Sequence, residues 1–426
     1  MTSIPFKFIP RGYLHFDSAV NKDVAEQIAT DPDTVARHPF YPFIEHTVTT
    51  QKIRKKAGGG VEMKEPKERP IAYAAHKDSH IFAHYSAVLG GLYEEALQAR
   101  GLGNVVTAFR RLDGKCNIHF ANEVFEFIKA HGACAVLASD ISDFFNQLDH
   151  RILKRAWATL LGMETLPDDH YAVFKAITRY GVVDRTEMYA ALGIDPLRPR
   201  VGRGHRICSP KQFREVVRGN GLCIRNNEGK GIPQGSPISA VLANLYMLEF
   251  DKIVNEFVTG HGGLYRRYCD DLLIVLPTAE LRDQAQILIG EQLAGLKLGE
   301  MHPEKTEQVD FVRQGDRLTT PKPLNYLGFT FDGQHKRIRP ASIARYYKKM
   351  RLGVGRAKAI RYRADRRAGY KARTPLRTRK LRLLYSYVGR HNFTSYVFKA
   401  ARIMGDPGIK KQIKPHWKKL QTLIEQ

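Results

Sequence analysis

The chain has 426 residues, of which 43% are hydrophobic, and it carries a formal net charge of +25 at pH 7. This length is sufficient for two or three packed subdomains, and no apolar run approaches the 18 residues of a membrane span. The five cysteines are scattered, odd in number and without a Cys-x-x-Cys pair, which argues against a disulfide framework or a zinc site and predicts a reducing, cytoplasmic setting.

The first readable elements are an extended segment and a helix. Residues 67–73 are expected to be extended, because Arg69 directly precedes Pro70 and such a residue is biased away from the helical region. Residues 78–99 carry apolar side chains at helical spacing, which predicts a packed helix.

An apolar strand is predicted over residues 135–139, and it ends in a carboxylate, Asp140. Two aromatic residues, Phe144 and Phe145, follow shortly afterwards. Further along, the glycine-rich turn at residues 229–235 leads into a predicted helix, with Ser236 as its cap and Pro237 at its first position.

Two adjacent carboxylates, Asp270 and Asp271, lie between an aromatic and basic run and an apolar run. The two runs predict short strands joined by a turn at Cys269–Asp271. An Asp-Asp pair is by itself a good turn sequence. Two like charges beside strands destined for a core are nevertheless unfavourable unless a cation neutralises them. A hard divalent ion such as Mg²⁺ prefers carboxylate oxygens and would do so, and Asp140 supplies a third carboxylate on another strand.

The rest of the chain is predicted to contain helices and one further hairpin. Residues 279–296 are amphipathic, residues 325–331 suit a hairpin, and residues 341–360 and 376–404 read as basic helices. Residues 336–426 hold 27 Lys and Arg against three acidic residues, a net charge of +24, whereas the remainder of the chain is close to neutral. Such an excess in one segment indicates a polyanionic partner, of which nucleic acid is the first choice.

Five short blocks, which follow one another along the chain in the family's order, resemble the motifs of reverse transcriptases. The Tyr-x-Asp-Asp signature is matched by residues 268–271, and the first catalytic aspartate by Asp140. The remaining matches are the Gly-Ile-Pro-Gln-Gly-Ser-Pro block at residues 231–237, Lys305 in its loop, and Asn-Tyr-Leu-Gly-Phe at residues 325–329.

The resemblance implies an α+β right-hand polymerase. Its fingers and palm would combine an antiparallel sheet with flanking helices, and its thumb would be helical and basic. The implied division is residues 1–132 for the N-terminal region and fingers, 133–335 for the palm with an insertion near 181–224, and 336–426 for the thumb.

The resemblance also implies the catalytic residues and the metal site. Asp140, Asp270 and Asp271 would be catalytic, and with Ile141 they would form the metal-binding set. Two Mg²⁺ ions, with Mn²⁺ as a substitute, would lie roughly 3.5–4 Å apart and support phosphoryl transfer.

Four residues are implied to contact the incoming deoxynucleoside triphosphate: Arg69, Phe145, Gln234 and Lys305. Phe145 matches the aromatic gate, whose ring leaves no space for a 2′-hydroxyl. The alternative interpretations are that Phe144 and Phe145 are both core residues, and that Arg69 and Lys305 are ordinary solvated side chains. Nucleic-acid contacts are expected at Arg110, Lys115, Tyr268, Arg361, Arg363, Arg366 and Arg367.

Among reverse transcriptases, the compact length, the insertion and the Tyr-Cys-Asp-Asp variant most resemble the bacterial defence-associated "unknown group" enzymes. That resemblance implies an RNA-directed DNA polymerase that makes cDNA from a structured, partner non-coding RNA in anti-phage defence, with no membrane partner. Retron or group II intron-like enzymes, template-independent or protein-primed polymerases of the abortive-infection type, and a non-catalytic RNA-binding protein are the alternatives.

Overall fold

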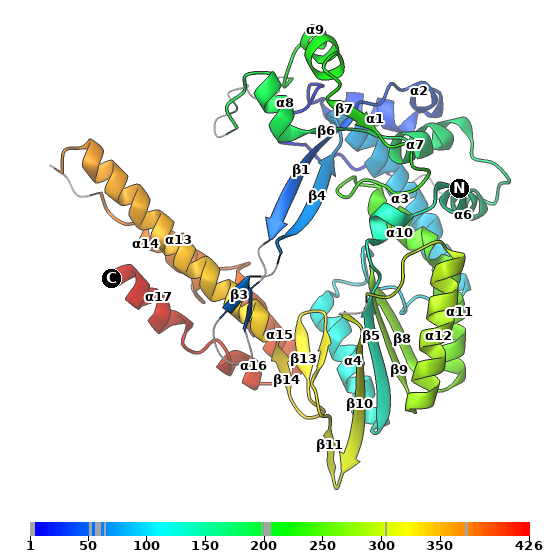
Figure 1. The fold of residues 1–426 in the computed structure, drawn as a ribbon, viewed down its shortest axis with the longest axis vertical. Helices are drawn as coiled ribbons and strands as arrows, with labels where there is room; N and C mark the ends of the chain where they lie inside the picture. The colour runs from blue at the N-terminus through cyan, green and yellow to red at the C-terminus, as the bar shows by residue number, and fades with distance from the viewer. Residues whose placement is uncertain are drawn as a thin grey trace. The chain divides into compact units, whose positions relative to one another are not determined.

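The structure, a computed structural model, describes residues 5–50, 53–55, 61–63, 65–196, 199, 206–302, 305–370 and 374–426 (Figure 1). The chain forms two compact units, each assembled from three separate segments. The first unit comprises Met1–Phe109, Ile141–Val254 and Ile289–Met301, and the second comprises Arg110–Asp140, Asn255–Leu288 and His302–Gln426.

The first unit contains a four-stranded sheet in the order β4-β1-β6-β7. β1 (Phe43–Thr50) pairs antiparallel with β4 (Lys67–Tyr73) and parallel with β6 (Gly181–Asp184), which in turn pairs with β7 (Cys223–Arg225). The segment expected to be an insertion therefore supplies two strands of this sheet, although residues 197–198 and 200–205 of it lie outside the described residues. A short hairpin, β2 (Ile53–Lys55) and β3 (Val61–Met63), belongs to the same unit.

Helices surround this sheet, and their apolar sides form the core of the unit. Phe16, Ile44, Val183 and Phe213 pack into one cluster that joins the N-terminal segment to the predicted insertion. The helices of the unit are α1 (Lys22–Thr30), α2 (Pro32–Ala36), α3 (His76–Ala99), α5 (Phe144–Gln147), α6 (His150–Leu160), α7 (Asp168–Thr178), α8 (Arg185–Ala191), α9 (Pro210–Gln212), a π-helical turn (Phe213–Arg218) and α10 (Ser239–Tyr246).

The second unit is built on a five-stranded antiparallel sheet in the order β11-β10-β5-β9-β8. The central strand β5 is buried from Cys134 to Ser139, and its residues Cys134, Val136 and Ala138 pack on the face covered by α4 (Asn117–His131). Val136 and Phe125 belong to this core. The strands are β5 (Cys134–Asp140), β8 (Leu264–Tyr268), β9 (Asp271–Leu276), β10 (Glu307–Gln314) and β11 (Arg317–Thr319).

A three-stranded sheet and five helices complete the second unit. The strands are β12 (Leu324–Tyr326), β13 (Phe329–Phe331) and β14 (Lys336–Ile338), so the predicted hairpin at residues 325–331 is confirmed. The helices are α13 (Pro340–Arg367), α14 (Thr378–Tyr385), α15 (Phe393–Met404), α16 (Gly408–Lys411) and α17 (His416–Glu425). α13, α14 and α17 share a small core around Met350 and Leu420.

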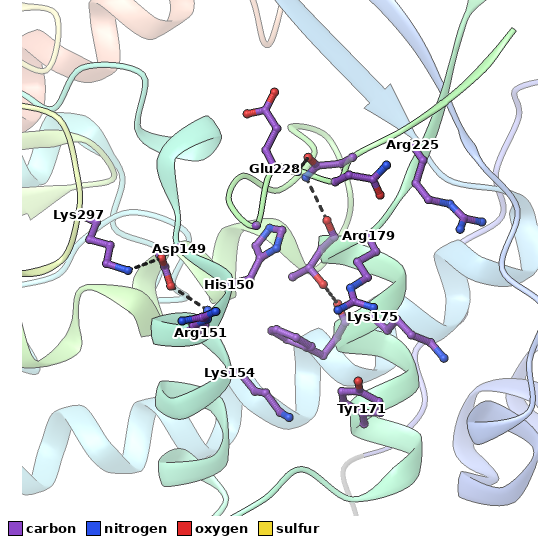
Figure 2. Close-up of a pocket in the computed structure, with 15 residues that line it drawn as sticks. Asp149, His150, Arg151, Lys154, Tyr171, Lys175, Arg179, Arg225, Glu228 and Lys297 are labelled. Carbon is purple, nitrogen blue, oxygen red and sulfur yellow. Dashed lines mark hydrogen bonds and ion pairs between the residues drawn. The ribbon is translucent and has the colours of Figure 1, made fainter. Parts of the chain in front are cut away.

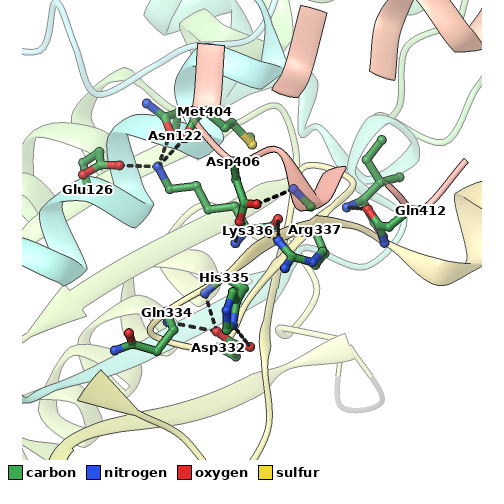
Figure 3. A network of polar contacts seen from close by, with 12 residues as sticks. Asn122, Glu126, Asp332, Gln334, His335, Lys336, Arg337, Met404, Asp406 and Gln412 are labelled. Atoms are coloured by element: carbon green, nitrogen blue, oxygen red, sulfur yellow. Dashed lines mark hydrogen bonds and ion pairs between the residues drawn. The ribbon is translucent and has the colours of Figure 1, made fainter. Parts of the chain in front are cut away.

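The Lys336 side chain connects the three-stranded sheet to two helices (Figure 3). Its ammonium group is almost completely buried, and it donates hydrogen bonds to Asn122 and Glu126 on α4 and to the Met404 carbonyl at the end of α15. The neighbouring Arg337 donates to Asp406. A buried ammonium group is stable only when such partners replace water, so two of the cations counted in the basic C-terminal segment hold the fold together.

The predicted α+β class is confirmed, and α3 and α13 confirm the helices expected at residues 78–99 and 341–360. Three further helix predictions can be compared with the structure. The helix expected at residues 279–296 is α12 (Ala279–Gly295). The helix expected at residues 376–404 is interrupted, because Asn392 caps a new helix, α15. The helix expected after Ser236 begins later, at Ser239, and is followed after Met247 by α11 (Leu248–Gly260). Among the described residues, no helix is both long and apolar enough to cross a membrane.

Candidate active site

Two of the predicted aspartates are direct neighbours in the central sheet of the second unit. β5 ends at Asp140, β9 begins at Asp271, and the antiparallel register pairs these two residues. Opposed residues on adjacent strands have Cβ atoms roughly 4.5–5.5 Å apart. The pairing therefore brings together two carboxylates that are remote in the sequence.

The turn between β8 and β9 carries the third aspartate. Tyr268 pairs with Asp271, which leaves Cys269 and Asp270 as a two-residue loop. Cys269 has φ +61°, a backbone conformation that glycine favours in such turns. The Cys269 carbonyl accepts a hydrogen bond from the fully buried Arg267 at 3.0 Å, and this contact helps to hold the turn.

The negative charges of the three aspartates are only partly balanced by nearby basic side chains. Burial, followed by the facing carboxylates of Asp270 and Asp140, raises the pKa of Asp271 to about 7, although Lys305 and Arg339 lower it. Lys305 donates from its ammonium group to the Asp140 carboxylate. Lys305 and Arg339 thus partly neutralise a cluster of like charges.

All of these side chains except that of Asp270 line a cavity of about 490 Å³ in the second unit. Tyr268, Asp140, Asp271 and Lys305 all belong to its wall. Sequence reasoning missed two further basic residues there, Arg339 and Arg345. Both lie at the start of α13, and their only sequence signal was membership of the basic C-terminal segment, which does not distinguish them from its other cations.

The expected divalent cation can be tested against these residues. Among the described residues, no group of three or more His, Cys, Asp or Glu side chains is arranged closely enough to hold a metal ion. The chemical character of the donors nevertheless fits a hard cation: the carboxylates of Asp140, Asp270 and Asp271 influence one another strongly enough to raise a pKa. Ile141 has a buried apolar side chain and would offer only its backbone carbonyl.

Three of the predicted nucleotide-binding residues lie in the first unit, around the loop at residues 231–235. The Ile232 N–H donates to the Phe145 carbonyl at 3.0 Å, and the Ala72 N–H donates to the Gln234 carbonyl at 2.8 Å. Arg69 is exposed on β4, the strand that contains Ala72. The loop that contains Gln234 is thus hydrogen-bonded to the segments of Arg69 and Phe145. The fourth predicted residue, Lys305, belongs to the second unit.

Gly235 explains why this loop approaches β4 so closely. It adopts φ +112°, and a Cβ atom there would lie 2.6 Å from the Ala72 carbonyl oxygen. No larger residue fits without moving the backbone. The helix that follows is anchored to the same loop, since the Ser239 hydroxyl donates to the Pro233 carbonyl at 2.6 Å.

The two neighbouring phenylalanines differ in their surroundings. Phe144 is 3% exposed and belongs to the core, whereas Phe145 is only half-buried. Their rings meet edge to face with centroids 5.6 Å apart. The geometry therefore assigns packing to Phe144 and leaves part of the Phe145 ring accessible.

The residues expected to contact nucleic acid all lie in the second unit. Arg361, Arg363, Arg366 and Arg367 are exposed on the last turns of α13. Tyr268 lines the cavity described above. Lys115 is engaged with Glu123 at 2.9 Å, and Arg110 is half-buried.

Comparison with solved structures finds yeast telomerases at low similarity. An apo telomerase from Candida tropicalis truncated from its C-terminal domain aligns with TM-score 0.42 and 9% identity, covering 74% of this chain and 60% of that chain. The untruncated apo telomerase from Candida tropicalis gives TM-score 0.43, 9% identity, and coverages of 75% and 54%. Telomerase from Candida albicans in complex with a fragment of telomeric RNA gives TM-score 0.42, 10% identity, and coverages of 92% and 62%.

The chain therefore spans less than two thirds of the length of each of these telomerases. No curated protein matches its sequence. The family match comes from the sequence, which fits the family described as reverse transcriptase (RNA-dependent DNA polymerase) over residues 102–331, more than half of the chain. That range includes Asp140, Gln234, Asp270, Asp271 and Lys305. The chain belongs to the reverse transcriptase family of RNA-dependent DNA polymerases.

Proposed function

We propose that this chain copies RNA into DNA, with Asp140, Asp270 and Asp271 as its catalytic residues. The observation that supports this proposal best is the cross-strand pairing of Asp140 with Asp271, beside a turn that carries Asp270. An acidic cluster in a cavity that also presents Lys305, Arg339 and Arg345 suits a reaction between a polyphosphate and a hydroxyl group.

The carboxylates would hold divalent cations, Mg²⁺ or Mn²⁺. When bound, such cations would lower the pKa of the primer hydroxyl and neutralise phosphate charge. Lys305, which pairs with Asp140 and lines the same cavity, would also bind a phosphate oxygen. Arg339 and Arg345 line the same cavity and would bind phosphate groups of the primer or the nucleotide.

Arg69, Phe145 and Gln234 would receive the incoming deoxynucleoside triphosphate. They are connected through one loop of the first unit, and Phe145 keeps an accessible ring that can exclude a 2′-hydroxyl. In this proposal residues 1–132 and 133–335 act as fingers and palm, with strands β6 and β7 of the 181–224 segment extending the sheet of the first unit.

The basic segment at residues 336–426 would act as a thumb that holds a template–primer duplex or a structured RNA. The four exposed arginines at the end of α13 support this role, because exposed cations on one helix can follow a phosphate backbone. Arg110, Lys115 and Tyr268 are proposed as further nucleic-acid contacts.

We further propose that the template is a partner non-coding RNA and that the cDNA serves bacterial anti-phage defence. The support is the resemblance of the Tyr-Cys-Asp-Asp turn to that of defence-associated enzymes. Five free cysteines suit a reducing cytoplasm. Template-independent or protein-primed synthesis is the alternative activity for the same site.

Primer extension with and without added RNA tests the activity. Wild-type protein is expected to incorporate deoxynucleotides only when RNA is present, and the double variant Asp270→Ala, Asp271→Ala is expected to lose synthesis while it retains RNA binding. The isosteric pair Asp270→Asn, Asp271→Asn controls for misfolding. Normal extension by both variants would refute the catalytic assignment, and RNA-independent synthesis by wild type would favour the alternative. Sequencing of co-purified nucleic acid then identifies the template.

A further inference from the structure

A second cavity, of about 640 Å³, lies entirely within the first unit and is rich in cations (Figure 2). α6, α7, the segment at residues 225–229 and Lys297 form its wall. It shares no lining residue with the cavity that contains the aspartates. Six basic side chains line it: Arg151, Lys154, Lys175, Arg179, Arg225 and Lys297.

Only one of these six cations is paired with a carboxylate in the described part of the chain. Lys297 pairs with Asp149 at 2.8 Å, and Asp149 also accepts hydrogen bonds from the first turn of α6. The only other acid in the wall, Glu228, is exposed and makes no ion pair among the described residues. The other five cations make no ion pair among the described residues, so the wall carries more positive than negative charge, an arrangement that a bound anion would stabilise.

An aromatic ring lies among these cations. The Lys154 and Lys175 ammonium groups lie 4.9 Å and 5.9 Å from the centre of the Tyr171 ring. Tyr171 is 39% exposed. Cation–π attraction holds each of the two lysines near the ring, and the accessible part of the ring offers a flat surface to an organic group.

The loop on the opposite side of the cavity is fixed by hydrogen bonds. The Asn226 amide donates to the Thr178 carbonyl at 3.0 Å and to the Lys230 carbonyl at 2.9 Å. A ring nitrogen of His150 contacts the Gly231 carbonyl at 2.8 Å. The wall of the cavity is thus held in place by the protein itself, and it leads directly into the loop that carries Gln234.

We propose that this cavity binds the polyphosphate chain of a nucleotide, at a site separate from the aspartates. Its volume lies within the range of roughly 300–1,000 Å³ typical of small-ligand pockets. Lysine and arginine are the side chains that bind phosphate oxygens best. A wall with six Lys and Arg side chains against two carboxylates suits a polyphosphate, which carries several negative charges.

The same chemistry is presented by a nucleoside triphosphate and by a free polyphosphate such as pyrophosphate. Occupancy would draw α6 and α7 towards the 225–231 loop and so steady the loop at residues 231–235. The inference is independent of the proposed polymerase activity, because none of the residues involved belongs to the proposed catalytic set.

Calorimetric titration of the full chain tests this inference. Inorganic tripolyphosphate, ATP and a single-stranded RNA oligomer are titrated separately in EDTA, into protein carrying Asp270→Asn and Asp271→Asn. With EDTA, this background prevents metal-dependent phosphate binding at the aspartates. Lys305, Arg339 and Arg345 remain there, so the cavity variant and its control below decide whether the binding that remains belongs to the cationic cavity. Stronger binding of ATP than of tripolyphosphate would show that the base contributes, whereas equal affinity would assign the site to polyphosphate alone; either result supports polyphosphate binding.

The decisive variant is Lys154→Gln, Lys175→Gln, Arg179→Gln. Its matched control is Arg155→Gln, Lys211→Gln, Arg214→Gln, which removes three exposed charges of the same unit outside the cavity. We expect tripolyphosphate affinity to fall about tenfold or more in the first variant and to stay within about twofold in the control. Thermal unfolding checks that both are folded, and Lys154→Gln alone replaces the triple variant if it is not.

Equal affinities in the two variants, or no tripolyphosphate binding by the parent protein, would overturn the inference. Loss of RNA binding in the cavity variant without any loss of tripolyphosphate binding would also overturn it, and would assign the cavity to a nucleic-acid strand.

Discussion

Asp140 and Asp271 are opposed residues on adjacent antiparallel strands, and their carboxylates belong to the wall of one cavity. The apolar residues that precede Asp140 on β5 and follow Asp271 on β9 fix this register. A slip of one residue would move every side chain of a strand to the other face of the sheet. The pairing of two acids is thus maintained by the burial of their hydrophobic neighbours.

The raised pKa of Asp271, about 7, has a consequence for stability. An unfolded aspartate has a pKa of about 3.9, so between about pH 4 and pH 7 the folded chain binds a proton that the unfolded chain releases. The contribution of this group to the free energy of unfolding therefore falls as the pH rises through that window. In EDTA, we expect Asp271→Asn to raise the melting temperature above wild type more at pH 8 than at pH 5.

Thermal unfolding at the two pH values measures this effect. Asp316→Asn, at an exposed position in the same unit, serves as the control and should show no such pH-dependent gain. A stabilisation by Asp271→Asn that is the same at both pH values would contradict the predicted titration.

The two phenylalanines after Asp140 should respond differently to truncation. Phe145→Ala is expected to raise ribonucleotide incorporation relative to deoxynucleotide incorporation, because the half-buried ring no longer excludes the 2′-hydroxyl. Phe144→Ala removes a buried ring and should instead destabilise the fold, by about 3–5 kcal/mol. Single-nucleotide incorporation assays and chemical denaturation separate the two effects. A folded Phe145→Ala variant with an unchanged sugar preference would place the gate elsewhere.

Gly235 should tolerate no side chain. Gly235→Ala combines a positive φ with a Cβ atom 2.6 Å from the Ala72 carbonyl oxygen, and backbone strain of this kind costs about 1–3 kcal/mol. We expect lower stability and weaker deoxynucleotide binding, because the loop that carries Gln234 must move. Gly290→Ala in α12, where nothing lies within 4 Å of the added Cβ, is the control and should leave both measurements unchanged or improved. Equal behaviour of the two variants would show that the loop adapts freely.

The end of α13 should contribute to the salt dependence of RNA binding. Each phosphate contact adds roughly −0.7 to the log–log slope for single strands and roughly −0.9 for a DNA duplex. Replacing Arg361, Arg363, Arg366 and Arg367 by glutamine should therefore make the slope shallower, whereas replacing them by lysine should preserve it. The measurement is the RNA affinity of wild type and both variants across a salt series. Identical slopes for wild type and the glutamine variant would show that this cluster is only a solvated surface.

Several features of this protein follow from the sequence alone. The strand that ends at Asp140, the Asp-Asp turn, the helix at residues 279–295 and the hairpin at residues 324–331 are all present. Each depends on a short pattern of apolar, turn or helix-forming residues, so local interactions suffice to specify it. The basic character of the C-terminal segment is likewise a property of composition.

Other features depended on the tertiary structure, because they result from contacts between residues far apart in the chain. The 181–224 segment became part of a sheet only through the pairing of β6 with β1. Lys336 reads as one more basic residue, yet burial against Glu126 and Met404 makes it a structural connection.

The two cavities illustrate the same difference. Arg339 lies in the same cavity wall as Asp140 and Asp271, because β14 leads into α13 beside the sheet of the second unit. The cationic cavity of the first unit collects Arg151, Lys175 and Lys297 from separate elements. Spacing in the sequence cannot reveal such groupings, because packing and strand pairing determine which side chains meet.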